Sequence, residues 1–148
     1  MKRETSAGAV IFRKDEGRKY LLLHYESGHW DYVKGNVERE EEIEDTIKRE
    51  AQEEAGISDL KFISGFNEKI NYFYAKKDKE LISKSVIFLL AETKQKEIRL
   101  SQEHVGYIWA DFQNAVKQLT YPSSKDILKK AEKFLDKQQK TLKSFIRD

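Results

Sequence analysis

The stretch Arg49-Glu-Ala-Gln-Glu-Glu-Ala-Gly56 carries three carboxylates within five residues, directly before a glycine. They belong to Glu50, Glu53 and Glu54. On a helix, like charges three or four residues apart repel each other, at a cost of roughly a few tenths of a kcal/mol per pair. Some other interaction must therefore offset this repulsion.

A helix is predicted over residues 40–55. Its acidic first turn suits the positive end of the helix macrodipole, and Gly56 can take the left-handed conformation that ends a helix. With about 100° between successive residues, one side of this helix is apolar and the opposite side faces water. The apolar positions are Ile43, Ile47, Ala51 and Ala55, and the water-facing positions are Asp45, Lys48, Arg49 and Gln52.

The three glutamates do not lie at the centre of the water-facing side of this helix. Glu54 projects about 40° from the centre of the apolar stripe and Glu50 about 80°, while Glu53 lies further round on the same flank. Arg49 can pair with Glu53 or with Asp45, but it cannot serve all three glutamates. Mg²⁺ can, because it prefers oxygen ligands, and Mn²⁺ could substitute for it. The alternative is an ordinary exposed helix of a Glu-rich protein.

The glutamates also belong to a longer pattern, G-x5-E-x7-R-E-U-x-E-E-x-G-U, where U is aliphatic or small. It is matched by Gly35, Glu41, Arg49, Glu50, Ala51, Glu53, Glu54, Gly56 and Ile57. This pattern is the Nudix box, and the sequence resembles a Nudix hydrolase. The resemblance implies an α/β/α sandwich with a mixed sheet, in which residues 35–57 form a loop–helix–loop.

The resemblance also implies cleavage of a nucleoside diphosphate that is linked to another group. It makes Glu50, Glu53 and Glu54 metal ligands and adds the backbone carbonyl of Lys34. The same resemblance gives structural roles to four box residues, which are Gly35, Glu41, Arg49 and Gly56. Among them, Arg49 would orient a ligand carboxylate and Glu41 would hold the loop in place. The loop at 36–40 lacks the Pro and Gly that many box loops carry.

Segments outside the box resemble the asymmetrical diadenosine tetraphosphate hydrolases of the animal and archaeal kind, over about residues 5–135. Val33 departs from that pattern, because proline usually precedes the lysine there. The matching segments are Tyr20–Leu23, Gly28–Trp30, Lys34–Glu38, Gly65–Phe66, Ile70–Tyr72, Lys84–Phe88 and Ile98–His104, followed by Tyr107 and Trp109.

Side chains in these segments suit a dinucleoside polyphosphate. A chain of four phosphates needs cations and donors, which His29, Lys34 and Lys84 can supply. An adenine ring needs flat apolar faces, which Tyr72 and Tyr121 can offer. Each of these residues also has an ordinary interpretation as a surface or core-edge residue.

Glu103 falls just past a short strand predicted at Ile98–Leu100, in a polar loop. It could bind a further metal ion or take the proton of the attacking water. His24 and His104 are interpreted as structural.

The chain shows neither an internal repeat nor a flexible linker, so residues 1–148 are read as one domain. Strands are expected to interleave with three helices, which favours a sheet with helices on its faces. The remaining expected elements are strands at 5–13, 20–25, 60–75, 84–93 and 105–110, a loop at 26–39, a short helix from Asp111 to Leu119 and a long amphipathic helix after Pro122.

Composition limits the partners. The chain has no cysteine, which fits a reducing cytoplasm, and its apolar run Val86–Ala91 is too short to cross a membrane. From Ser123 to Asp148 there are eight Lys or Arg against four Asp or Glu, a net charge of +4. This basic tail could touch RNA, or it could be a solvated helix face.

These observations predict an Mg²⁺-dependent hydrolase that splits diadenosine tetraphosphate into ATP and AMP by attack of water on phosphorus. Three alternatives stay open: a pyrophosphohydrolase acting on capped or triphosphorylated RNA 5′ ends, a nucleoside triphosphate pyrophosphohydrolase, and a catalytically silent domain that senses a nucleotide. The four intact glutamates argue against the silent domain.

Overall fold

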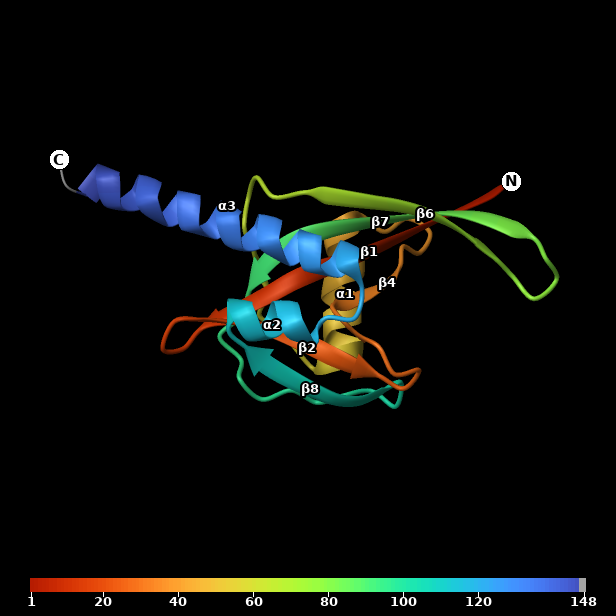
Figure 1. The fold of residues 1–148 in the computed structure, drawn as a ribbon, viewed down its shortest axis with the longest axis horizontal. Coiled ribbons are helices and arrows are strands. Elements are labelled where there is room, and N and C mark those ends of the chain that lie inside the picture. Colours follow the sequence, from red (N-terminus) through yellow and green to blue (C-terminus); the bar gives the residue numbers. More distant parts are fainter. Residues whose placement is uncertain (147–148) are drawn as a thin grey trace.

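A mixed sheet of eight strands carries three helices in the computed structural model, which describes residues 1–146 (Figure 1). α1 packs on one face of the sheet, and α2 and α3 pack on the other. The elements are β1 (Lys2–Lys14), β2 (Arg18–Tyr25), β3 (Trp30–Asp31), β4 (Val33–Asn36), α1 (Ile43–Ala55), β5 (Lys61–Phe62), β6 (Glu68–Ala75), β7 (Leu81–Glu92), β8 (His104–Ala110), α2 (Phe112–Gln118) and α3 (Pro122–Ile146).

β1 is the central strand. It runs parallel to β7 from the pair Lys2–Ile82 to the pair Phe12–Glu92. On its other side, β4 pairs with residues 6–9 of β1 and β2 pairs with residues 12–14, both antiparallel. β4 therefore occupies a short gap beside the first half of β1, and this position matters for the site.

Both faces of β1 are buried, which explains its continuous apolar run from Ala7 to Phe12. Ala7, Ala9 and Ile11 pack against α1, and Val10 and Phe12 pack in the core that α2 and α3 cover. The small residues on the first face leave room for α1 to lie close to the sheet.

The predicted box helix is present, although it begins at Ile43 rather than at residue 40. Glu40 has a φ of 71°, which is incompatible with a right-handed helix, and Glu42 is the N-cap. The amide of Glu42 donates to Asp45 Oδ2 at 3.0 Å, which forms a capping box. Gly56 ends the helix with a φ of 68°, as expected.

Three expectations about strands were wrong in detail. The single strand predicted at 60–75 is divided into β5 and β6 by a turn at Gly65, whose φ is 99°. The loop predicted at 26–39 contains β3 and β4. Residues 98–100 form no strand: Ile98 and Leu100 are apolar because they pack on the α1 side of the core, and the Arg99 amide donates to Ala55 O at 3.0 Å.

The last two helices match the prediction. Asp111 caps α2 by accepting a hydrogen bond from the Asn114 amide at 2.9 Å. The apolar stripe of α3 is buried up to Leu135, but Leu142, which the pattern placed on the same stripe, is 60% exposed. The reason is that α3 extends past the edge of the sheet (Figure 1). Arg147 and Asp148 of the basic tail lie outside the described residues. No helix within residues 1–146 is long and apolar enough to span a bilayer.

Candidate active site

The three glutamates of α1 differ in burial in the order that the helix phase predicts. The side chain of Glu54 is 7% exposed, that of Glu50 is 14% exposed and that of Glu53 is 59% exposed. Glu50 and Glu54 face each other next to β4, whereas Glu53 lies on the rim. Among residues 1–146, no three His, Cys, Asp or Glu side chains are already arranged as the ligands of a metal ion.

Gly35 makes room for Glu50. A Cβ atom at Gly35 would lie 2.1 Å from Glu50 Cδ and 2.2 Å from Glu50 Oε1, which is far inside van der Waals contact. The Glu50 carboxylate therefore rests directly against the β4 backbone. Any larger residue at position 35 would displace it.

Arg49 connects the helix to the box loop. Its Nε donates to Glu41 Oε2 and one terminal nitrogen donates to Glu50 Oε1, both at 2.8 Å. The other terminal nitrogen donates to Asn36 O at 3.0 Å, and the nitrogen that contacts Glu50 also lies 3.5 Å from Glu53 Oε2. The expectation that Arg49 faces water was wrong, because its side chain folds back over the carboxylates and is only 24% exposed.

Glu41 holds the box loop in place. It accepts hydrogen bonds from the Glu38 amide and the Thr46 hydroxyl, both at 2.9 Å. The hydrogen bond from Arg49, with that from the Glu38 backbone, lowers the pKa of Glu41 to about 2. Glu41 is therefore a carboxylate at neutral pH.

Glu54 is the most unusual acid of the site. Burial, followed by the hydrogen bond with Glu50, raises the pKa of Glu54 to about 10, although the backbone of Lys34 and the Tyr25 hydroxyl act in the opposite direction. The Tyr25 hydroxyl lies 3.3 Å from Glu54 Oε1. Two close carboxyl groups, one of them buried, need either a shared proton or a bound cation. Such a set of hard oxygen donors fits a divalent cation.

A groove of about 680 Å³ lies on the other side of β4. Successive residues of a strand point to opposite faces, so Gly35 faces Glu50 while the Lys34 side chain faces the groove. Two half-exposed tyrosines, Tyr72 and Tyr121, line it together with His29. The backbone of β4 is therefore shared by the carboxylate pair and the groove.

The cations near the groove are held in place. Lys34 Nζ donates to the buried Asp31 Oδ2 at 3.0 Å, and Asp31 also accepts a bond from the Ser124 hydroxyl at 3.1 Å. Lys84 does not line the groove, but it pairs in register with Tyr72 on β6. Its Nζ donates to Asn36 Oδ1 at 2.8 Å.

Stacked rings connect the groove with the carboxylates. His29 stacks on Tyr25 with centroids 4.5 Å apart and planes 9° apart, and the His29 ring lies 5.5 Å from Tyr121. Burial lowers the pKa of His29. Tyr25 was not singled out from the sequence, although its hydroxyl reaches Glu54 and its ring supports His29.

Glu103 is exposed in the loop before β8. The Glu103 amide donates to Ser101 Oγ at 3.3 Å, and its carbonyl accepts from the Glu26 amide at 2.9 Å. The next residue, His104, lies with Nε2 3.5 Å from Glu54 Oε1. The loop thus reaches the carboxylates through His104, which the sequence pattern led us to interpret as structural.

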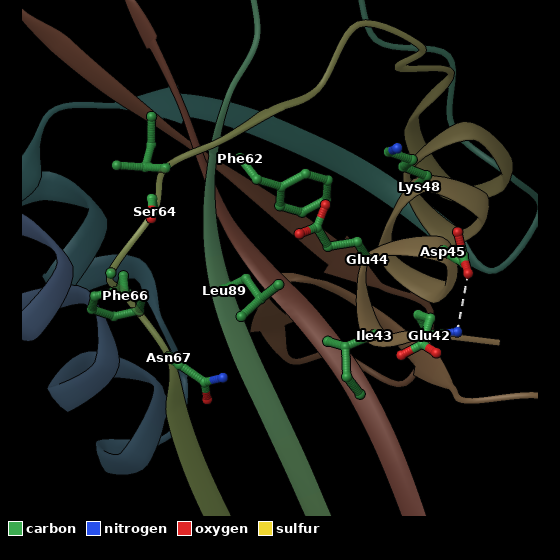
Figure 2. Close-up of a pocket in the computed structure, with 12 residues that line it drawn as sticks. Glu42, Ile43, Glu44, Asp45, Lys48, Phe62, Ser64, Phe66, Asn67 and Leu89 are labelled. Atoms are coloured by element: carbon green, nitrogen blue, oxygen red, sulfur yellow. Dashed lines mark hydrogen bonds between the residues drawn. The ribbon is translucent and has the colours of Figure 1, made fainter.

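A larger hollow, of about 1020 Å³, lies between the start of α1 and the segment that joins β5 to β6 (Figure 2). Phe62 and Leu89 line it beside Glu44 and Lys48. Figure 2 shows Asp45 turned toward the Glu42 amide, so that this acid serves the helix cap. The hollow shares no lining residue with the groove, and we assign it no function.

A family model for the NUDIX domain matches residues 2–131. The chain belongs to the NUDIX family. An asymmetrical bis(5′-nucleosyl)-tetraphosphatase of Sus scrofa is 36% identical over 143 residues, which cover 88% of this chain and 94% of the pig protein. The corresponding Caenorhabditis elegans enzyme is 33% identical and is covered to 95%.

Solved structures agree with the NUDIX assignment. The structure of a C. elegans Ap4A hydrolase binary complex matches with a TM-score of 0.78 at 32% identity, over 90% of this chain and 98% of that one. A NUDIX domain from Shewanella oneidensis, complexed with ADP-ribose, matches with a TM-score of 0.72 over 91% of this chain and 90% of that one, at 13% identity, and so shows the likeness of fold alone. The predicted family and α/β sandwich are confirmed.

Proposed function

We propose that this NUDIX protein hydrolyses diadenosine tetraphosphate asymmetrically, to ATP and AMP, with Mg²⁺ as its metal ion. One observation carries the proposal: a groove with two exposed tyrosines and a lysine shares the β4 backbone with the buried carboxylate pair of the Nudix box. A substrate that has both a base and a phosphate chain needs both features. The names of the pig and nematode relatives support the same substrate class.

The fit to a metal ion rests on the donor set. Glu50 and Glu54 are the inner pair, Glu53 on the rim completes the set, and the Lys34 carbonyl is the backbone candidate. A divalent cation held there would neutralise phosphate charge and supply an activated water. Mn²⁺ is the expected substitute, because it takes the same oxygen ligands.

The substrate would be held by the groove. Tyr72 and Tyr121 would stack on an adenine ring, at roughly 1–3 kcal/mol per stacked base. His29, Lys34 and Lys84 would bind the phosphate chain. Water attacks one phosphorus in line, the bond to the bridging oxygen breaks, and that oxygen leaves on the neighbouring phosphate. No covalent bond to the enzyme forms.

Glu103 is proposed to take the proton of the attacking water, because its loop joins the carboxylate cluster through His104. Glu103→Gln should slow hydrolysis by about 10²–10⁴-fold, the usual size of a general-base contribution. The pH–rate profile at low and high Mg²⁺ checks this role. Recovery of the rate at high Mg²⁺ would indicate a metal ligand instead, and an unchanged rate would remove Glu103 from the mechanism.

A substrate panel tests the proposal as a whole. Purified protein with Mg²⁺ is incubated with dinucleoside polyphosphates, nucleoside triphosphates, nucleotide sugars and triphosphorylated or capped RNA, and the products are separated chromatographically. We expect the highest kcat/KM for diadenosine tetraphosphate, with ATP and AMP in equal amounts.

Other outcomes would favour the alternatives. Preference for RNA 5′ ends would point to the exposed lysines of α3, and preference for a nucleoside triphosphate would indicate a general pyrophosphohydrolase. Tight nucleotide binding without turnover of any compound would mean a sensor. A cytoplasmic location, suggested by the absence of cysteine, stays a prediction.

A further inference from the structure

We propose that His104 is a positioning residue that holds the Glu54 carboxylate from behind through its Nε2–H group. The inference rests on the proposed function, because it concerns how the carboxylates hold a cation. His104 stands at the start of β8, and its side chain is fully buried. Its Nε2 atom is one of two buried side-chain nitrogen or oxygen atoms among the described residues without a hydrogen-bond partner.

The hydrogen bonds around Ser101 are those expected if Nε2 carries the proton of the His104 ring. Ser101 Oγ accepts a bond from the Glu103 amide at 3.3 Å, which leaves its own hydroxyl hydrogen free to donate. His104 Nδ1 lies 2.9 Å from Ser101 Oγ, and we assign it as the acceptor of that hydrogen. In a neutral imidazole the other nitrogen then bears the hydrogen, so Nε2 is a donor.

This donor has one acidic neighbour within ion-pair distance among the described residues. Nε2 lies 3.5 Å from Glu54 Oε1, slightly too far for a good hydrogen bond. The His104 and Tyr25 rings pack edge to face, with centroids 4.4 Å apart, which limits the tilt of the imidazole. A movement of less than about 1 Å would bring the pair to an ordinary N–H···O distance.

In this pair, His104 lies on the protein side of Glu54, whose carboxylate is a proposed metal ligand. Groups in this position orient a metal ligand and satisfy the oxygen that does not face the ion. The Tyr25 hydroxyl lies 3.3 Å from the same oxygen of Glu54, but its hydrogen is directed to the Tyr32 carbonyl at 2.5 Å. His104 would therefore supply the N–H donor to this oxygen and fix the direction of the carboxylate.

Mn²⁺ binding, followed by the loss of the free-ion signal in electron paramagnetic resonance, tests the inference without substrate or turnover. His104→Leu removes the donor and should raise the Kd for Mn²⁺ by about 10–100-fold. His104→Gln keeps an N–H group at a similar reach and should retain most of the affinity. Ser101→Ala frees the tautomer and should give an intermediate loss.

His24→Gln is the matched control. His24 stacks on Trp30 at 4.4 Å and belongs neither to the groove nor to the carboxylate cluster, so its replacement should leave the Kd unchanged. Circular dichroism melts confirm that each variant is folded.

The outcomes distinguish the role of His104 from the existence of the cation site. An unchanged Kd in folded His104→Leu would overturn the role of His104. If His104→Leu does not fold, an unchanged Kd for Mn²⁺ in Ser101→Ala would overturn the role of His104 instead. Equal losses in His104→Leu and His104→Gln would mean that ring packing, and not the donor, matters. Wild-type protein that binds no Mn²⁺ would remove the cation site itself, and this inference with it.

Discussion

At the scale of single residues, the site depends on one position where only glycine fits. Gly35→Ala would place a Cβ atom 2.1 Å from Glu50 Cδ, so the carboxylate or β4 must move. We expect kcat to fall at least about 10-fold, because misplacement of a catalytic group by about 1 Å is costly. Turnover of diadenosine tetraphosphate measures this effect.

Gly106→Ala provides the control for Gly35→Ala. A Cβ atom at Gly106 would meet only His24 Cβ, at 3.7 Å, which is an ordinary contact. Equal turnover losses in the two variants would mean that the glycine at position 35 has no special relation to Glu50.

The proposed adenine site gives a second prediction at this scale. Tyr72→Ala should weaken the binding of adenosine-containing substrates by roughly 1–3 kcal/mol, because a stacking face is lost. Inorganic tetraphosphate has no ring and should bind as before. Isothermal titration with both ligands in the presence of Ca²⁺ in place of Mg²⁺ would measure the difference.

Phe73→Ala is the neighbouring control, since Phe73 is 64% exposed and points to the opposite face of β6. Its replacement should affect neither ligand. A loss in Tyr72→Ala that is equal for both ligands would assign Tyr72 to the fold rather than to the base.

At the scale of elements, α3 is attached to the sheet through Glu132. Its Oε1 accepts from both Arg18 and the buried Tyr20 hydroxyl at 2.6 Å. Glu132→Ala would leave the Tyr20 hydroxyl without a partner, so we expect a loss of about 1–3 kcal/mol in the free energy of unfolding. Urea denaturation measures it.

Lys130→Ala, on the same helix, removes an exposed ion pair with Glu68 at 3.3 Å. Surface pairs contribute roughly 0–1 kcal/mol, so this variant should be close to wild type. The account of α3 docking would fail if the two substitutions had equal effects.

The same scale shows what sequence patterns can predict. The phase of α1 predicted the burial order of Glu54, Glu50 and Glu53, because that order depends only on helix geometry. Gly56 and Asp111 were found because helix ends have local signals. Arg49 was misplaced because its partners are Glu41 in the box loop and the Asn36 carbonyl at the end of β4, and the helix phase does not contain the path of either segment.

Contacts between segments that are distant in the chain could not be predicted from sequence patterns. Tyr25 and Asp31 carry no motif, and together with His104 they join the site only because β2, β3 and β8 meet there. The strand predicted at Ile98–Leu100 was wrong because alternating apolar residues can also cover a helix end without pairing to a strand.

At the scale of the whole molecule, β4 accounts for the way in which the proposed site would hold two parts of a substrate. It fills a gap beside β1, so that α1 can place carboxylates against one side of its backbone while α3 and β6 form the groove on the other. We propose that these carboxylates act through a cation in the transition state.

The most direct test is the steady-state hydrolysis of diadenosine tetraphosphate by wild type and Glu53→Gln with Mg²⁺, with Glu44→Gln as the exposed control on the same helix. We expect Glu53→Gln to lower kcat by at least about 10³-fold with a much smaller change in KM, because transition-state stabilisation is lost. Glu44→Gln should retain full activity. Near-normal turnover in Glu53→Gln would contradict the assignment of the α1 carboxylates as the metal site.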